Sequence, residues 1–530
     1  MKKTVKRSDK LAAVFNRSFF IFYLALSVLV GGAGLVTVAV FGELGTEYPM
    51  PVPTVILRFA ALLFCFAALT ALFVFCFRFL QSDKLRRLDR RRFNTAVIFG
   101  CAALLLAVQL VFAFLLRMKP ITDIERLELY ARRIVADDSF ACLNSDDPEL
   151  NHYIIRYQNN LPYLLFITLI HKITYSLTGG FSQIPLIVIS TLCINASMLM
   201  TVLVSRRLFG ERKAVLTLLL CALFTPYYTY TAYYYTDSFS IPFVIGTVYT
   251  LVAALQSGSR RKKAVLLLIC GALCCVGFKM KGSVAIMVPA LLIYMPMRYG
   301  FKRAAKMCGV FLLSFCVLLG GFNLAIKRSK LISEEQSDRY QFPAAHWVML
   351  GLNDKGAFTF EDSRISESFP TKQERLSGEL REIGRRISGY GFFGIIVHAG
   401  YKLVWTYMDG TYYIANYLAH FRHRTPLHSF ILYEGRFRFA FFAYSFGFQI
   451  MLLVMIALSG LKARRERRLD VTTLFRIILT GMVLFFMIWE TNARYPFNFT
   501  PLYMLLATDG LDGFSQSLKA RKRDHGAVMK

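Results

Sequence analysis

The sequence is poor in charged residues, and poorest in acidic ones. Asp, Glu, Lys and Arg make up 18% of its 530 residues, against about 25% in a typical soluble domain. Hydrophobic residues reach 55%, and the mean hydropathy is +0.46. Apolar runs long enough to cross a bilayer recur along the whole chain. These properties exclude a secreted enzyme, a soluble cytosolic enzyme and a disordered tail protein.

Cysteines placed for disulfides or metal binding are also missing. Ten of the 11 cysteines lie in apolar stretches, and only Cys142 lies in a polar segment. This distribution excludes a disulfide framework and a metal-ligand spacing. We interpret the apolar cysteines as small packing residues. The sequence also has no Walker-type or GxGxxG loop for binding a nucleotide.

The apolar segments predict an all-α polytopic membrane protein with about twelve transmembrane helices. Basic residues precede the first segment, and no small-residue cleavage site follows promptly, which indicates an uncleaved span rather than a signal peptide. The predicted spans are 19–41, 54–80, 94–116, 182–205, 214–234, 238–256, 264–278, 283–299, 307–326, 437–461, 472–489 and 496–516.

The positions of the basic residues predict how these spans are oriented. The chain has 63 Lys and Arg against 33 Asp and Glu, a net charge of +30. Of these 63 basic residues, 34 lie in the two termini and in the loops that the predicted spans place on the same side of the membrane as the N-terminus. The positive-inside rule then places both termini in the cytoplasm and the polar regions 118–181 and 327–436 outside. The charge therefore reflects topology, and we expect no nucleic-acid partner.

Two further apolar segments, Leu161–Thr178 and Phe392–Met408, would move basic loops outside if they crossed the membrane. We therefore predict that they are interfacial helices of the two outer regions. The chain divides into four parts: an N-terminal two-span extension with a basic loop (1–93), a transmembrane core (94–326), a large outer region (327–436), and three spans with a basic tail (437–530).

The first candidate site residue is Asp123. Pro120 is well suited to start a helix, and Asp123 would then lie in its first turn, at the mouth of the bundle. A half-shielded carboxylate there can act as a general base on an acceptor hydroxyl. The alternative is an ordinary acidic residue favoured by the helix dipole. Glu125, two residues further on, is a second candidate acid.

The other candidates lie in four polar clusters at the same predicted side. Arg156, Tyr157, Asn159 and Asn160 suit sugar hydroxyls and phosphate oxygens, or else an aromatic belt. Tyr235 and Asp237 end a tyrosine-rich turn, where an acid is costly unless it is partnered or functional. Lys279 and Lys281 are outward cations that suggest a lipid phosphate. Glu490, Arg494 and Tyr495 form either a structural ion pair or an arginine clamp for an anionic headgroup.

Together these clusters resemble the GT-C superfamily of integral-membrane glycosyltransferases, which includes protein O-mannosyltransferases and the bacterial aminoarabinose transferases of lipid A. The similarity extends over about 110–510 and lies in the order and the sidedness of the motifs. The sequence departs from the pattern in having Ile124 between its two acids and two spans before the usual first one. The first departure leaves open which acid is the base.

The resemblance implies a sugar transferred with inversion from a polyprenyl-phosphate donor to a glycan, lipid or protein acceptor. It implies Asp123 as base, and Lys279, Lys281 and Arg494 as counter-charges for the leaving phosphate. We expect a bacterial plasma-membrane protein acting on the outer face. No cofactor is certain, and a divalent metal remains an option. The alternatives are a transporter or flippase, a polymerase or ligase of lipid-linked saccharides, and a non-catalytic scaffold.

Overall fold

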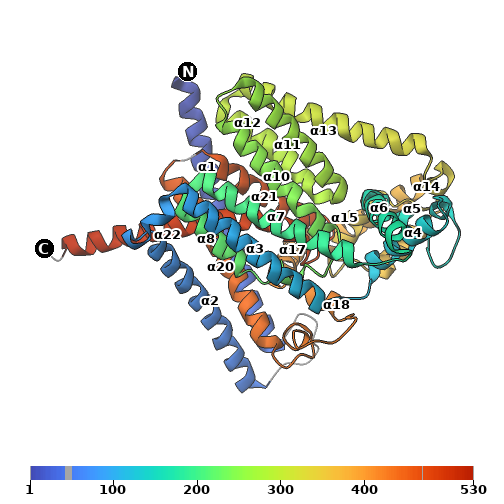
Figure 1. Ribbon diagram of the computed structural model, residues 1–530, viewed down its shortest axis with the longest axis horizontal. Helices are drawn as coiled ribbons and strands as arrows, with labels where there is room; N and C mark the ends of the chain where they lie inside the picture. Colours follow the sequence, from blue (N-terminus) through green and yellow to red (C-terminus); the bar gives the residue numbers. More distant parts are fainter. Residues whose placement is uncertain (1, 42–50, 468, 529–530) are drawn as a thin grey trace.

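The computed structural model describes residues 2–41, 51–467 and 469–528. Within these ranges the regular elements are helices, and the only β-bridge joins Met118 to Phe421. The helices form an elongated bundle with the short helices gathered at one end (Figure 1). The prediction of an all-α membrane protein is therefore confirmed.

Ten helical segments of the described chain are long and apolar enough to cross a membrane. They are α1 (Lys2–Phe41), α2 (Val52–Leu80), α3 (Arg91–Leu115), α7 (Ile184–Phe209), α10 (Thr236–Gln256), α11 (Arg260–Met280), η4 (Gly282–Ile286) with α12 (Met287–Tyr299), α13 (Phe301–Ser329), α20 (Arg438–Arg465) and α21 (Val471–Ile488). These ten correspond to ten of the predicted spans.

The other two predicted spans, 214–234 and 496–516, differ from an apolar spanning helix. The range 214–234 contains two short helices, α8 (Glu211–Ala222) and α9 (Pro226–Thr229), instead of one long helix. The 12 residues of α8 extend only about 18 Å, against about 30 Å of hydrocarbon. Asn94 and Gln109 of α3 donate hydrogen bonds to the carbonyls of Glu211 and Tyr227. The broken segment therefore follows α3 for about 22 Å and crosses most of the bundle.

In place of the last predicted span, α22 (Thr500–Val528) begins inside the bundle and carries Asp509 and Asp512. Lys462 Nζ lies 2.7 Å from Asp509 and 2.6 Å from Asp512, and Lys213 Nζ lies 2.7 Å from Asp512. Acidic residues are tolerated here because they pair with cations away from lipid. Because α22 carries Asp509 and Asp512, it is not among the segments that are apolar enough to be recognised as spans from composition.

The two ends of the bundle differ in composition. The basic end carries the loops 82–92, 206–213, 257–263, 298–306 and 462–470. The loop end carries α4 (Thr122–Ala136), α5 (Tyr153–Arg156), α6 (Leu161–Thr178), α14 (Glu334–Tyr340), α15 (Ala345–Gly351), α16 (Phe360–Glu367), α17 (Lys372–Tyr407), α18 (Ile414–Leu418) and α19 (His428–Ile431). In Figure 1, α4 to α6 and α14 lie at the right and the C-terminus at the left. The regions 118–181 and 327–436 thus share one end, as predicted.

The first two helices pack onto the C-terminal part of the chain. Both α1 and α2 lie against α20, which also contacts α22. Gly447 permits the approach of α2, because a Cβ there would lie 2.9 Å from the backbone nitrogen of Phe66. The segment predicted as an N-terminal extension is therefore part of the same helical bundle.

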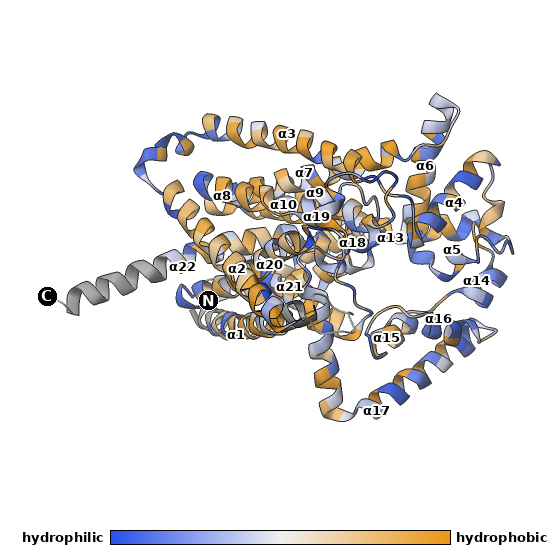
Figure 2. Ribbon diagram, turned by 90° about the horizontal axis from the view of Figure 1, so that it is seen from below, coloured by the Kyte–Doolittle hydropathy of each residue, from blue (hydrophilic) through white to orange (hydrophobic). Residues whose placement is uncertain are grey.

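The apolar segments predicted to be interfacial are not among the ten spanning segments. The first is α6 (Leu161–Thr178), which packs on α4. The second lies in α17, which is kinked at Gly391, where φ is 60°. Figure 2 shows a hydrophilic half of α17 before the kink and a hydrophobic half after it. Phe392 and Phe393 are exposed just beyond the kink, as an interfacial helix requires.

The sidedness of the two ends is testable by cysteine labelling. Glu361 in α16 and Glu466 after α20 are both exposed, at the loop end and the basic end respectively. We expect a membrane-impermeant maleimide to label Glu361→Cys in intact cells and Glu466→Cys only after permeabilisation, with the parent chain as background. Labelling of both positions, or only of Glu466→Cys, in intact cells would reverse or refute the orientation.

Candidate active site

Asp123 lies in the first turn of α4, as predicted. The strand-like segment before it is fixed by the Met118–Phe421 bridge and by a 2.7 Å hydrogen bond from Lys119 N to His420 O. Thr122 has φ 51°, a left-handed conformation that is strained for a β-branched residue. The backbone is thus held in an unfavourable conformation next to the carboxylate.

Two tyrosine side chains hold the Asp123 carboxylate. The hydroxyl of Tyr153 donates to Oδ1 at 2.9 Å, and that of Tyr235 donates to Oδ2 at 3.1 Å. Asn160 Nδ2 donates to the Tyr153 hydroxyl at 2.7 Å, which orients that tyrosine. Each carboxylate oxygen keeps a second lone pair, and the side chain remains 34% exposed. Asp123 is therefore both oriented and accessible.

A second carboxylate, Asp237, lies deeper. Its side chain is fully buried in the first turn of α10, and its Oδ1 accepts a hydrogen bond from Lys281 Nζ. Lys281 follows the last residue of α11, and its Nζ lies 5.1 Å from the centre of the Tyr495 ring. A buried carboxylate needs such a partner because desolvating a lone charge is costly. Asp237 and Lys281 thus form a buried ion pair at the loop end.

Arg494 connects the two carboxylates. Its Nη2 lies 3.6 Å from Asp123 Oδ2, and its Nη1 lies 4.0 Å from Asp237 Oδ2. Nη1 also donates a hydrogen bond to the Tyr233 hydroxyl. The guanidinium lies over the rings of Tyr235, Tyr417 and Tyr495, at 5.2, 5.6 and 5.5 Å from their centres. These aromatic faces stabilise a cation that is only 11% exposed.

The segment carrying Arg494 is fixed by the large region 327–436. Glu490 N donates to Trp347 O at 2.9 Å, and Thr491 N donates to Gly356 O at 2.8 Å. Lys402 of α17 donates to the carbonyls of Gly351, Met487 and Trp489 at 2.8, 3.1 and 2.8 Å. Burial lowers the pKa of Lys402 to about 8. A cation that caps the end of α21 thus helps to hold the segment that carries Arg494.

Glu490 is bound to tyrosine, not to Arg494. The Tyr495 hydroxyl donates to Glu490 Oε1 at 2.9 Å, and no Glu490–Arg494 ion pair occurs in the described chain. The structural pair considered from the sequence is therefore absent. Burial raises the pKa of Glu490 to about 7. This carboxyl group can change its charge near neutral pH.

Four of the predicted site residues lie outside this cluster. Arg156 pairs with Glu367 at 2.6 Å and joins the two loop-end regions. Glu125 and Asn159 are exposed. Lys279 donates to Asn323 of α13 at 2.7 Å, on a different side of α11 from Lys281. Of the two lysines left open by the sequence, only Lys281 therefore joins the cluster.

Tyr157 lies beside the cluster instead of within it. Its ring is 5.1 Å from that of Tyr153 and packs against Phe342 and Trp347. The predicted residues brought together are Asp123, Asn160, Tyr235, Asp237, Lys281, Glu490, Arg494 and Tyr495.

Sequence reasoning missed Tyr417 and Lys402. The Tyr417 ring stacks on Tyr233 at 4.3 Å and faces Arg494. Burial raises the pKa of Tyr417 to about 12. Neither residue lies in a polar cluster of the sequence, so only the fold identifies them. Tyr153 and Tyr233 lie in the polar clusters around Arg156 and Tyr235, where the sequence does not distinguish them from the neighbouring tyrosines.

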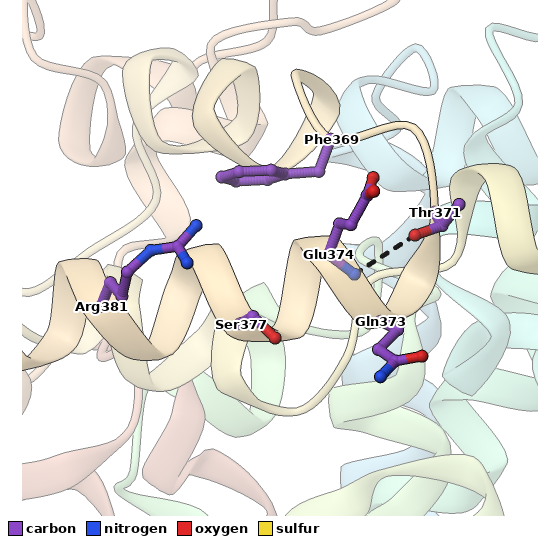
Figure 3. Close-up of a pocket in the computed structure, with 6 residues that line it drawn as sticks. All are labelled: Phe369, Thr371, Gln373, Glu374, Ser377 and Arg381. Carbon is purple, nitrogen blue, oxygen red and sulfur yellow. Dashed lines mark hydrogen bonds between the residues drawn. The ribbon is translucent and has the colours of Figure 1, made fainter.

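A separate surface hollow of about 590 Å³ lies at the start of α17 (Figure 3). It is lined by Phe369, Thr371, Gln373, Glu374, Ser377 and Arg381. Within it, Glu374 N donates to Thr371 Oγ1, which is an ordinary N-cap. Its two charged residues, Glu374 and Arg381, are both exposed. None of these residues belongs to the cluster around Asp123 and Arg494.

The residues that the structure describes form no candidate metal site. No group of three or more His, Cys, Asp or Glu side chains in these ranges is arranged to hold a metal ion.

The chain matches, over residues 16–512, the model of a family described as conserved hypothetical integral membrane protein. No curated protein matches it. Two solved structures are similar, both of ArnT from Cupriavidus metallidurans, a GT-C aminoarabinose transferase. The one bound to undecaprenyl phosphate has 14% identity and a TM-score of 0.31, covering 78% of each chain. The apo one has 15% identity and a TM-score of 0.31, covering 79% of this chain and 77% of ArnT. At that score the functional conclusion depends on the geometry of the site.

The pKa of Glu490 predicts a pH-dependent stability. A carboxyl group whose pKa is raised by burial stabilises the fold below the pKa of the unfolded chain, and this stabilisation is lost as pH rises through the folded pKa. From about pH 4.5 to above pH 7 the loss is about 3 kcal/mol. We expect Glu490→Gln, which stays neutral, to melt at increasingly higher temperature than the wild type as pH rises from 5 to 8. A melting-temperature difference independent of pH would show that Glu490 does not titrate in the fold.

Proposed function

The chain belongs to the family described as conserved hypothetical integral membrane protein, and we propose that it is an inverting glycosyltransferase. Its donor is a sugar on a polyprenyl phosphate, and its acceptor is a glycan, lipid or protein group presented at the loop end. The membrane is the bacterial plasma membrane, and the loop end faces outward. The undecaprenyl phosphate bound by ArnT belongs to the same class of lipid phosphate.

One observation carries the proposal: an accessible carboxylate faces two shielded cations at the end of a membrane bundle. Asp123 is 34% exposed, whereas Arg494 is 11% exposed and Lys281 lies behind it against Asp237. Sugar transfer from a lipid phosphate requires a base for the acceptor and positive charge for the leaving phosphate. Both requirements are met within one cluster at the loop end of the bundle.

The chemistry follows from these positions. The acceptor oxygen attacks the anomeric carbon, and its proton passes to a free lone pair of Asp123. The bond between the anomeric carbon and the phosphate oxygen breaks, and its electron pair leaves with the phosphate, which gains one negative charge. Arg494 and Lys281 stabilise that charge in a site where the low dielectric strengthens their effect. Attack from the side opposite the phosphate inverts the configuration.

The two cations and two carboxylates of the site prepare it for the change of charge on the phosphate. In the structure the two cations face two carboxylates, Asp123 and Asp237. When Asp123 takes up a proton, it no longer neutralises Arg494. The guanidinium is then free to act on the phosphate at the moment when the phosphate becomes more negative. This coupling favours the transition state over the bound donor.

A transporter would place its charges along a path through the membrane. Near the basic end lies a group of charges that are buried or partly buried: Lys213, Lys462, Arg476, Asp509 and Asp512. They lie within 4.0 Å of one another in pairs. Such mutual pairing locks helices together. The accessible carboxylate lies at the other end, which favours an enzyme over a transporter or flippase. A polymerase or ligase of lipid-linked saccharides would use the same chemistry with a glycan acceptor.

Replacing the proposed base gives the first test of this function. We expect Asp123→Asn to reduce sugar transfer about 10²- to 10⁴-fold without a large change in donor affinity or melting temperature. The matched control is Glu125→Gln, two residues further along α4, which removes an exposed acid and should keep its activity. Transfer measured with a lipid-linked sugar in reconstituted membranes checks both. Full activity of Asp123→Asn, or an equal loss in the control, would remove Asp123 as the base.

The phosphate contact gives the second test. Arg494→Ala should weaken binding of a polyprenyl phosphate about ten- to a hundredfold, since a charged hydrogen bond contributes about 1.5–3 kcal/mol. Arg494→Lys should lose less, because the charge remains while the planar two-point contact is lost. Affinity and melting temperature are measured on the same samples. A lowered melting temperature with unchanged affinity would make Arg494 a structural residue.

A further inference from the structure

The cation excluded from the active site, Lys279, lies on the other side of α11. Its Nζ donates to Asn323 Oδ1 at 2.7 Å, and it lies 4.6 Å from the centre of the Phe322 ring. Lys281, only two residues later, points into the bundle toward Asp237. The end of α11 therefore presents one cation to the site and one to the surface of the bundle.

Two further lysines, Lys327 and Lys330, lie on the neighbouring helix α13 and at its end. Hydrogen bonds from Ser314 to Leu268 and from Lys279 to Asn323 show that α11 and α13 run in the same direction, side by side. Lys327 is four residues beyond Asn323, so it lies one turn further along the same face. Lys330 is the C-cap of α13, in a left-handed conformation with φ 48°, and lies just past the end of the helix. We call Lys279, Lys327 and Lys330 the lysine row.

The lysine row extends outward from the surface on which it begins. After Asn323, α13 continues to Ser329, about 9 Å further along its axis. In Figure 1, α13 runs along the upper edge of the bundle and ends near α14, beyond the end of α11. Lys327 and Lys330 are exposed, and within the described ranges none of the three lysines forms an ion pair with a carboxylate. The row is thus a positive surface without an internal counter-charge.

Below the lysine row the same two helices are apolar and open. Val317 of α13 is 62% exposed, and its neighbours on both helices are exposed as well. The exposed apolar residues are Val265, Ile269 and Val276 on α11, and Leu313, Leu318 and Leu324 on α13. In a membrane-spanning helix this surface faces acyl chains. Positive charge directly above an acyl-chain surface is the arrangement that binds a lipid headgroup.

We propose that the lysine row binds the headgroup of an anionic bilayer phospholipid, with its acyl chains against α11 and α13. Charge complementarity identifies this occupant. Three lysines without acidic partners match the phosphates of a bilayer surface, whereas a single polyprenyl phosphate is expected at Lys281 and Arg494 inside the bundle. A lipid bound here would hold the ends of α11 and α13 together next to the active site, and this proposal does not depend on sugar transfer.

The test is a titration of the purified full chain with phosphatidylglycerol and with phosphatidylcholine, followed by native mass spectrometry. We expect phosphatidylglycerol to bind more tightly, and the triple variant Lys279→Gln/Lys327→Gln/Lys330→Gln to bind it at least tenfold more weakly. The conservative triple variant to Arg should retain binding, because it keeps the charge. High salt should weaken binding, since Lys327 and Lys330 are exposed.

The matched control removes three cations from the loop end away from the lipid-facing helices, Lys355→Gln/Lys372→Gln/Arg381→Gln. Lys355 follows α15, Lys372 and Arg381 lie in the first part of α17, and all three side chains are accessible. We expect phosphatidylglycerol affinity to stay within twofold of the wild type. Equal affinity in the lysine-row variant and the control would overturn the proposal. So would weakened binding of a polyprenyl phosphate, used as a third probe, with unchanged binding of phosphatidylglycerol.

Discussion

The burial of Arg494 is the constraint on which the loop end of the bundle depends. A guanidinium that is 11% exposed cannot lose its charge, so the surrounding chain must supply acceptors and aromatic faces. Asp123 and Asp237 provide the negative charge, and Tyr233, Tyr235 and Tyr417 enclose the cation. These residues come from α4, α10, α18 and the turn before α10. Segments far apart in the sequence therefore meet around this one buried cation.

The region 327–436 supplies the support for this arrangement. Lys402 holds the carbonyls at the end of α21, and Arg375 is buried with hydrogen bonds to backbone carbonyls of Ser366 and Gln341. His346, Ser366 and Glu379 also form a buried group, but the serine lies in the middle, 2.8 Å from His346 and 2.6 Å from Glu379. A nucleophilic serine needs an accessible oxygen next to its base, so this trio is structural. The large region therefore supports the site and also contributes Tyr417 of α18 to it.

Helix positions could be predicted from the sequence wherever a helix faces lipid, because lipid selects long apolar runs. At the predicted spans 214–234 and 496–516, α8 and α22 lie inside the bundle, so α8 can be short and α22 can carry Asp509 and Asp512. Asp123, Asp237 and Arg494 could be anticipated because charged residues at a membrane edge need a reason to be there. Tyr417 and the different sides of Lys279 and Lys281 could not, since they depend on how helices rotate against one another. Glu490 shows the same limit: its spacing suggested Arg494, but the chain turns it toward Tyr495.

The position of a bound donor lipid tests the central claim most directly. A structure of the full chain in lipid nanodiscs with a polyprenyl phosphate would show where the phosphate lies. The account predicts phosphate oxygens within hydrogen-bonding distance of Arg494 and Lys281, with Asp123 across the space that a sugar would fill. A phosphate bound elsewhere, with Arg494 still between its two carboxylates, would contradict it.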